Sequence, residues 1–216
     1  MKKYTLLTLL FLLCVNVCYP QYSLKEDMEK YFTLDQINEY NRHLEDLETQ
    51  IEHSESKEPY SSFHYYLYSK LTEINNLKSD NPSLELVAAR IYSLIAGYDR
   101  EYPAIYNNLG CVLFRFAKFT NDFTDYNEEI KQLLFKSEEM SNQIAAYNLA
   151  CYYSFINRKE ESLKWLRLMA SKSYNKPTTT IDREMLENDS DFNNIKYEPE
   201  FGEFLEKYYS HASVSD

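Results

Sequence analysis

The sequence predicts an all-α fold built from antiparallel helix hairpins, and two observations carry this prediction. First, the 216-residue chain contains only three glycines and six prolines. Tight β-turns and phosphate-binding loops usually need glycine, because a positive φ angle carries little strain only there. This composition argues against β-sandwiches, Rossmann units and P-loops. Second, apolar residues recur at steps of three and four, the spacing of a helix, without strand-like alternation.

An N-terminal helical region is expected over residues 23–98. Capping-box patterns at Ser23 ("SLKE") and Thr33 ("TLDQ") mark helix starts. An apolar stripe then follows the helix over 34–53: Ile37, Tyr40, Leu44, Leu47 and Ile51. The stripe is short, so it predicts packing within the domain rather than a free coiled coil. A helix from about Pro59 and another ending near Gly97 come next, and this pair is a candidate degenerate repeat.

The remaining helices are expected over about 103–119, 125–141, 144–156 and 159–172, followed by three short helices within 180–209. The links "KSDNPS", "TNDFTDYN" and "SYNKPTTT" are polar and lack apolar periodicity. Short links between helices of this length favour antiparallel hairpins.

Two stretches of this helical region repeat each other. "AIYNNLGCVLFRFAKF" begins at Ala104 and "AAYNLACYYSFINRK" at Ala145, and aligning Asn108–Cys111 with Asn148–Cys151 gives a spacing of 40 residues. An amphipathic helix follows each one, which is typical of a repeat array. These residues resemble the tetratricopeptide repeat. The resemblance implies two repeats over 103–176, stacked as a short α-solenoid, with Gly110 and Ala150 where paired helices cross closely.

The C-terminal stretch "DSDFNNIKYEPEF" is similar to the segment that closes many bacterial tetratricopeptide proteins. It implies capping helices over 177–209 and a disordered tail over 210–216. A stack leaves an open apolar end that must be covered. The residues expected to cover it are Phe192, Ile195, Phe201, Phe204 and Leu205, whereas Asp189, Asp191, Glu198, Glu200 and Glu203 are expected to face water.

The resemblance also implies a partner-binding surface on the concave face, formed by the first helix of each repeat. Its residues would be Asn107, Cys111, Phe114, Arg115, Tyr147, Cys151, Ser154 and Phe155. Aromatic rings supply anchoring area, and Arg115 with Asn107 can hold carboxylates or peptide groups. The alternative is that Phe114, Tyr147 and Phe155 are simply buried between repeats. Arg115 is nearly the only basic side chain there, which argues against capture of a C-terminal carboxylate.

The sequence predicts no enzyme, no metal site and no cofactor. Cys111 and Cys151 are expected to be free thiols, because neighbouring helix axes lie about 8–10 Å apart and a disulfide needs Cα atoms within about 7 Å. The histidines lie outside the repeats, so no nucleophile–base pair is expected. "DSDFNNIKYEPE" has oxygen ligands at calcium-loop spacings, but Lys196 and Pro199 interrupt the pattern, which favours an acidic, helix-capping linker.

The N-terminus "MKKYTLLTLLFLLCVNVCYPQ" has the character of an export signal. Two lysines precede an apolar run shorter than the ~20 residues that span a bilayer, so residues 1–20 are expected to be a cleaved signal peptide. The alternative is a bacterial lipoprotein that keeps a lipid anchor on Cys14 or Cys18. The expected location is therefore periplasmic, envelope-associated or secreted.

The formal net charge of −11 excludes the basic face that nucleic-acid binding requires. The sequence thus predicts an exported protein that binds a protein or peptide partner and performs no catalysis. Two alternatives remain open. One is a metal-binding or enzyme accessory protein that uses the acidic tail, and the other is an envelope subunit that self-assembles through the 34–53 stripe.

Overall fold

The computed structural model describes residues 31–56, 60–77, 83–98, 100–121, 126–172 and 181–209. The predicted signal peptide, the capping box at Ser23 and the tail over 210–216 lie outside these ranges. Within them the chain is helical and contains no strand, which confirms the all-α prediction. None of the described helices has the length and apolar character needed to cross a bilayer.

The chain divides into two compact units, Met1–Tyr126 and Asn127–Asp216, here called unit 1 and unit 2. The division lies inside the segment 103–176 that was predicted to hold two repeats. In each unit the helices pack mainly against neighbours in chain order, which confirms the prediction of stacked helices.

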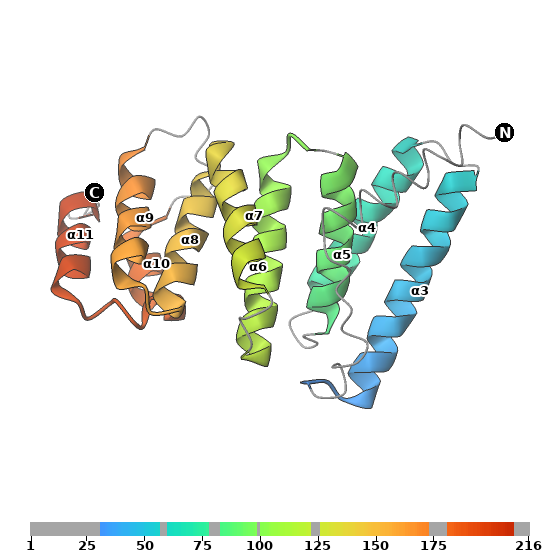
Figure 1. Cartoon of the computed structure of the whole chain (residues 1–216), viewed down its shortest axis with the longest axis horizontal. Helices are drawn as coiled ribbons and strands as arrows, with labels where there is room; N and C mark the ends of the chain where they lie inside the picture. The colour runs from blue at the N-terminus through green and yellow to red at the C-terminus, as the bar shows by residue number, and fades with distance from the viewer. Residues whose placement is uncertain are drawn as a thin grey trace, which may run out of the picture. The chain divides into compact units, whose positions relative to one another are not determined.

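Unit 1 contains α3 (Leu34–Ser56), α4 (Tyr60–Leu77), α5 (Leu84–Tyr98) and α6 (Pro103–Thr120). Helix α5 packs against α3, α4 and α6, and is the central element of the unit (Figure 1). Its residues are buried on nearly all sides, as expected for a helix with neighbours around it. The mostly apolar sequence of α5 therefore reflects its central position.

The first turn of α3 confirms the predicted capping box. The Thr33 N–H donates to Gln36 Oε1 at 2.9 Å, and the Gln36 N–H donates to Thr33 Oγ1 at 3.4 Å. The apolar stripe of α3 faces the unit, with Leu47 fully buried and Ile37, Tyr40, Leu44 and Ile51 partly buried. The stripe therefore packs within unit 1, as predicted.

Replacing Thr33 by alanine is expected to lower the free energy of unfolding of unit 1 by about 1 kcal/mol, because the Gln36 N–H loses the Thr33 hydroxyl that accepts its hydrogen bond. Urea unfolding followed by far-ultraviolet circular dichroism measures this loss. Thr49→Ala on the same helix is the matched control. The Thr49 hydroxyl only donates to the Glu45 carbonyl within α3, so this change should be neutral or stabilising. Equal losses for both variants would contradict the capping role.

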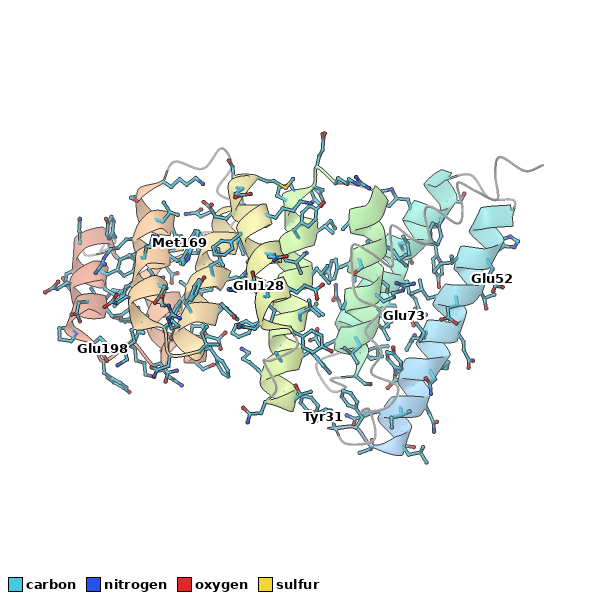
Figure 2. All side chains as sticks on the ribbon, viewed as in Figure 1. Tyr31, Glu52, Glu73, Glu128, Met169 and Glu198 are labelled. Carbon is cyan, nitrogen blue, oxygen red and sulfur yellow. The ribbon has the colours of Figure 1, made fainter. Side chains whose placement is uncertain are left out.

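Unit 2 contains α7 (Asn127–Glu139), α8 (Gln143–Phe155), α9 (Lys159–Ser171), α10 (Arg183–Asn188), the 3₁₀ helix η2 (Ser190–Phe192) and α11 (Pro199–Tyr209). Helix α8 packs against α7, α9 and η2, and α9 packs against α11. The Ser162 hydroxyl on α9 donates to the Ala150 carbonyl at 2.7 Å, so these two helices cross at the predicted small residue. Figure 2 shows side chains filling the space between these helices, with Met169 labelled on α9.

Helices α6 and α8 have the same burial pattern over the aligned residues 105–110 and 145–150, and differ after it, where Cys111 is half-buried and Cys151 is buried. They begin at Pro103 and Gln143, 40 residues apart (143 − 103 = 40). Gly110 and Ala150 are both buried, and Asn108 and Asn148 are both half-buried. The spacing found in the sequence thus matches positions that are alike in the structure.

The C-terminal segment covers unit 2 with the predicted apolar residues. Phe192, Ile195, Phe201, Phe204 and Leu205 are all buried. Glu200 and Glu203 are exposed as expected, but the expectation that Asp189, Asp191 and Glu198 face water is wrong, since all three are half-buried. Glu198 forms an ion pair with Lys159 at the start of α9.

Asparagine and serine, rather than glycine, occupy the left-handed positions near helix ends. Helix α5 ends at Tyr98, next to the expected stop at Gly97, but no described glycine has a positive φ. Instead Asn121, Ser141 and Asn157 have φ angles of 54°, 67° and 60°. Asparagine tolerates this region because its short polar side chain can hydrogen-bond locally.

Candidate functional site

The predicted partner-binding residues on α6 differ in their accessibility. Arg115 is exposed and Cys111 is half-buried, and together with Asn108 they follow helical spacing along one face of α6. Asn107 and Phe114 are buried. Among the residues predicted on α6, Cys111 and Arg115 can therefore meet a partner, and Asn107 and Phe114 contribute to packing.

Arg115 is held in place by a buried carboxylate on the neighbouring helix. Its Nε donates to Glu85 Oε1 at 2.8 Å and its Nη2 donates to Glu85 Oε2 at 3.1 Å. Glu85 lies in the first turn of α5, where the helix dipole favours a negative charge. Burial acts to lower the pKa of Arg115, but the hydrogen bond and charge of Glu85 outweigh it, so that the pKa is raised. The guanidinium is thus fixed in orientation, and its charge is balanced.

A buried tyrosine links this pair to a third helix, α4. The Tyr92 hydroxyl on α5 lies near the side chains of Asn75 on α4 and Asn108 on α6, and near Arg115 and Cys111. Burial raises the pKa of Tyr92, which keeps the hydroxyl neutral. We call this group the α6 polar cluster: Asn75, Glu85, Tyr92, Asn108, Cys111 and Arg115.

Sequence reasoning found two members of the α6 polar cluster, Cys111 and Arg115, and missed the others. Glu85 and Tyr92 lie on a helix that was expected to supply only packing. The signal that could have found them was the presence of Glu85 in a helix whose other residues are mostly apolar, "LELVAARIYSLIAGY". A buried carboxylate of this kind needs a cationic partner.

On α8, the predicted partner-binding residues contact the chain's own C-terminal segment. Tyr147, Cys151 and Ser154 are buried, and Phe155 is half-buried. The Tyr147 hydroxyl donates to Asp189 Oδ2, and the Cys151 thiol lies 3.8 Å from the same oxygen. Burial, followed by Cys151 and Asp189, raises the pKa of Tyr147, so that its hydroxyl stays a donor.

Two further contacts complete this junction. The Phe192 ring meets the Tyr147 ring edge-on, with 5.6 Å between centroids. The Asn194 side-chain amide donates to the carbonyls of Ser154 at 2.9 Å and Phe155 at 3.3 Å, at the end of α8. The four predicted residues of α8 thus lie where α8 meets the 189–194 segment.

One group of side chains in unit 2 has the residue types of a metal site. Donor atoms of Cys151, Asp189 and Asp191 lie within 4.8 Å of one another. However, Asp189 Oδ1 accepts the Asp191 N–H at 2.8 Å, and Oδ2 accepts the Tyr147 hydroxyl. Asp189 is therefore already used as the N-cap of η2. This geometry agrees with the acidic, helix-capping linker that the sequence favoured over a calcium loop.

We expect the thermal midpoint of the chain to be the same in millimolar Ca²⁺, in Zn²⁺ and in excess chelator, because both oxygens of Asp189 already accept hydrogen bonds. A site saturated to 100 times its dissociation constant would add about 2.7 kcal/mol, which calorimetry would detect easily. A rise in midpoint with either ion that disappears in an Asp191→Asn variant would instead establish a metal site.

The two described cysteines, Cys111 and Cys151, are free thiols, as predicted. Comparison of the chain with protein-family models, with curated proteins and with solved structures gave no match. The tetratricopeptide resemblance therefore stays a prediction from the residues, and the functional proposal depends on the geometry of the α6 polar cluster.

Proposed function

We propose that this chain is an exported, non-catalytic, tetratricopeptide-like protein that binds a protein or peptide partner. The proposed binding surface is the α6 polar cluster, which shares Cys111 and Arg115 with the predicted concave face. The observation that supports it most is the pair of hydrogen bonds by which exposed Arg115 binds the buried Glu85 carboxylate in a bidentate manner. The export part of the proposal depends on the N-terminal sequence alone.

An arginine held in this way is suited to recognising a peptide. Its side chain is already ordered, so a partner loses little additional conformational entropy on binding. Because Glu85 uses Nε and Nη2, the Nη1 donors are left for another acceptor. The balanced charge favours neutral carbonyl groups of a peptide over a free carboxylate.

The neighbours of Arg115 add to this surface. Half-buried Asn108 offers an amide, and half-buried Cys111 is small enough to let a partner approach the helix. The two alternative functions have less support. Asp189 in the acidic tail is engaged within the chain, and the α3 stripe is packed within unit 1.

A displayed library of random peptides tests the proposal, because it samples many sequences at once and requires no chosen partner. The full chain should enrich a related set of peptides, and the double variant Glu85→Gln/Arg115→Gln should lose them. This variant removes both charges but leaves two amides able to pair. Arg167→Gln on α9, also an exposed arginine, is the control and should retain the peptides.

Circular dichroism shows whether each variant is folded, so that a loss of binding can be distinguished from a loss of folding. Peptides retained equally by the double variant would exclude the α6 polar cluster as the binding surface. Enrichment of no peptide would count against the proposed function as a whole.

A further inference from the structure

The two halves of α3 are attached to unit 1 by different kinds of contact. At its N-terminal end, Phe32 packs with Leu86 of α5 and Phe116 of α6 in a buried cluster, joined by Ile37 and Tyr40. The Phe32 ring also stacks on Phe119, with 5.5 Å between centroids. This end is thus held by apolar contacts, which do not change with pH.

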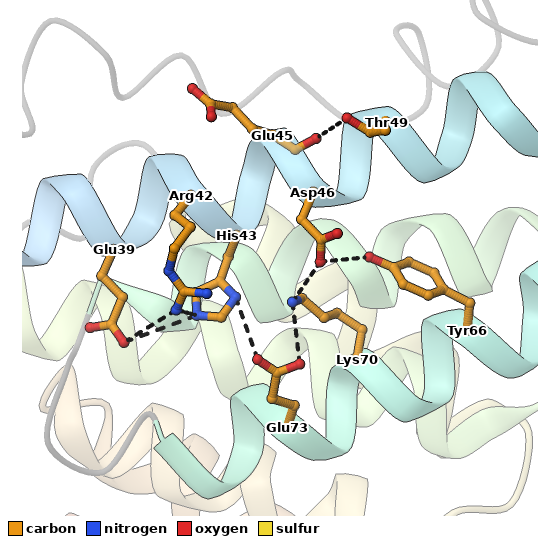
Figure 3. A network of polar contacts seen from close by, with 9 residues as sticks. All are labelled: Glu39, Arg42, His43, Glu45, Asp46, Thr49, Tyr66, Lys70 and Glu73. Atoms are coloured by element: carbon orange, nitrogen blue, oxygen red, sulfur yellow. Dashed lines mark hydrogen bonds and ion pairs between the residues drawn. The ribbon is translucent and has the colours of Figure 1, made fainter.

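The middle of α3 adds to its buried Leu47 a network of charged and polar contacts with α4 (Figure 3). Lys70 of α4 is buried, and its Nζ lies 2.7 Å from Asp46 of α3 and 3.2 Å from Glu73. The Tyr66 hydroxyl donates to Asp46 at 3.1 Å. Hydrogen bonding to Lys70 lowers the pKa of Asp46, so this carboxylate stays charged at neutral and mildly acidic pH.

His43 lies beside this group and is fully buried. Its Nε2 is 2.8 Å from Nη2 of Arg42. A guanidinium can only donate, so Nε2 must accept, and the ring is therefore neutral with its proton on Nδ1. That nitrogen is 3.8 Å from Glu73 Oε1 and has no hydrogen-bond partner in the described structure.

Protonation of His43 is incompatible with this arrangement. A proton on Nε2 would face the donor of Arg42, so the two N–H groups would repel each other and Arg42, whose side chain is 64% exposed, would move into solvent. The acceptors within reach are Glu39, 4.0 Å from Nε2, and Glu73, 3.8 Å from Nδ1. Glu73 already contacts Lys70 through its other oxygen, Oε2, so a protonated His43 and Lys70 would have to share one carboxylate.

The other charges near α3 do not relieve this conflict. Helix α5 also packs against α3, and its Glu85 is paired with Arg115. The charge of Arg90, also on α5, acts to lower the pKa of Tyr40, which burial raises. Burial, followed by the cations Lys70 and Arg42, lowers the pKa of His43, despite the opposing carboxylates Glu73 and Glu39.

We propose that α3 is a pH-sensitive arm whose second half, His43–Ser56, loosens from α4 when His43 takes up a proton, while the cluster around Phe32 keeps the first half in place. The direction of this pH dependence follows from the linkage between proton binding and opening. The opened form binds the proton more tightly than the packed form, so the attachment is complete above the ordinary histidine pKa of about 6.5 and weakens as the pH falls below it. Loosening would uncover Leu47.

Hydrogen exchange followed by mass spectrometry on the full chain tests this proposal. After correction for intrinsic exchange, protection of residues 43–53 should fall more than threefold between pH 7.5 and 5.5. A single proton limits the change to tenfold for each pH unit. Protection of α5 should stay constant.

The variant His43→Gln should lose this pH dependence, because glutamine cannot take up a proton. His53→Gln, at an exposed position of the same helix, should keep it and is the matched control. Equal protection of the wild type at both pH values, or the same pH dependence in His43→Gln, would overturn the proposal.

A measurement on the wild type keeps the test independent of how the variants fold. Nuclear magnetic resonance should show that the pKa of the His43 ring lies below the ordinary histidine value of about 6.5. A His43 pKa at or above 6.5 would overturn the proposal, because the packed form would then bind the proton at least as well as the opened form.

Discussion

Replacing Phe192 by alanine is expected to lower the free energy of unfolding of unit 2 by about 3–5 kcal/mol, because a fully buried aromatic side chain is lost and a cavity remains. Phe192 contacts the Tyr147 ring on α8 and the Phe201 ring on α11, with 6.0 Å between centroids in the second pair. A loss of this size is a large part of the 5–15 kcal/mol that stabilises a typical domain.

The chain's single tryptophan makes this effect measurable in unit 2 alone. Trp165 lies on α9 against Phe135 of α7, so its fluorescence during urea unfolding reports on that unit. Tyr197→Ala is the control from the same segment. Tyr197 is 86% exposed, and its removal should change stability by less than about 0.5 kcal/mol. A Phe192→Ala variant as stable as this control would mean that the C-terminal segment does not hold unit 2 together.

Arg115→Gln is expected to destabilise unit 1 by roughly 2–3 kcal/mol, because buried Glu85 loses the guanidinium that pairs with it. Breaking a fully buried pair costs about 3–5 kcal/mol, and the Arg115 side chain is 42% exposed, so that water screens part of the loss. Urea unfolding followed by circular dichroism measures the change.

The reverse variant and the double variant give this prediction its control. Glu85→Gln should cost only about 1 kcal/mol, because an unpaired Arg115 can turn to solvent. Adding Glu85→Gln to Arg115→Gln should restore most of the lost stability, since no buried charge remains. Additive losses in the double variant would show that the two residues act independently.

The helices could be predicted from the sequence because apolar spacing and polar links are local signals. The helix expected over 103–119 spans Pro103–Thr120, and the one expected over 144–156 spans Gln143–Phe155. The end of α5 near Gly97 was also predictable, since the helix ends at Tyr98, but the backbone conformation of Gly97 was not. A glycine permits the left-handed conformation without requiring it, and no described glycine has a positive φ.

The candidate site could be predicted from the sequence only where its residues lie on the same helix. Helical spacing identifies Cys111 and Arg115 as neighbours on α6, but the partner of Arg115 lies 30 residues away, on a helix whose rotation is set by packing. Similarly, the acidic linker around Asp189 was recognised, whereas its position against Tyr147 depends on how the segment folds back onto α8. Contacts between distant elements have no periodic signature in a single sequence.

The packing of each helix on its neighbours in the chain has a consequence for folding kinetics. Contacts that join nearby segments close short loops, so each new helix can dock as soon as the preceding one has formed. We therefore expect fast refolding within each unit, with unit 1 able to form on the ribosome before unit 2 has been synthesised.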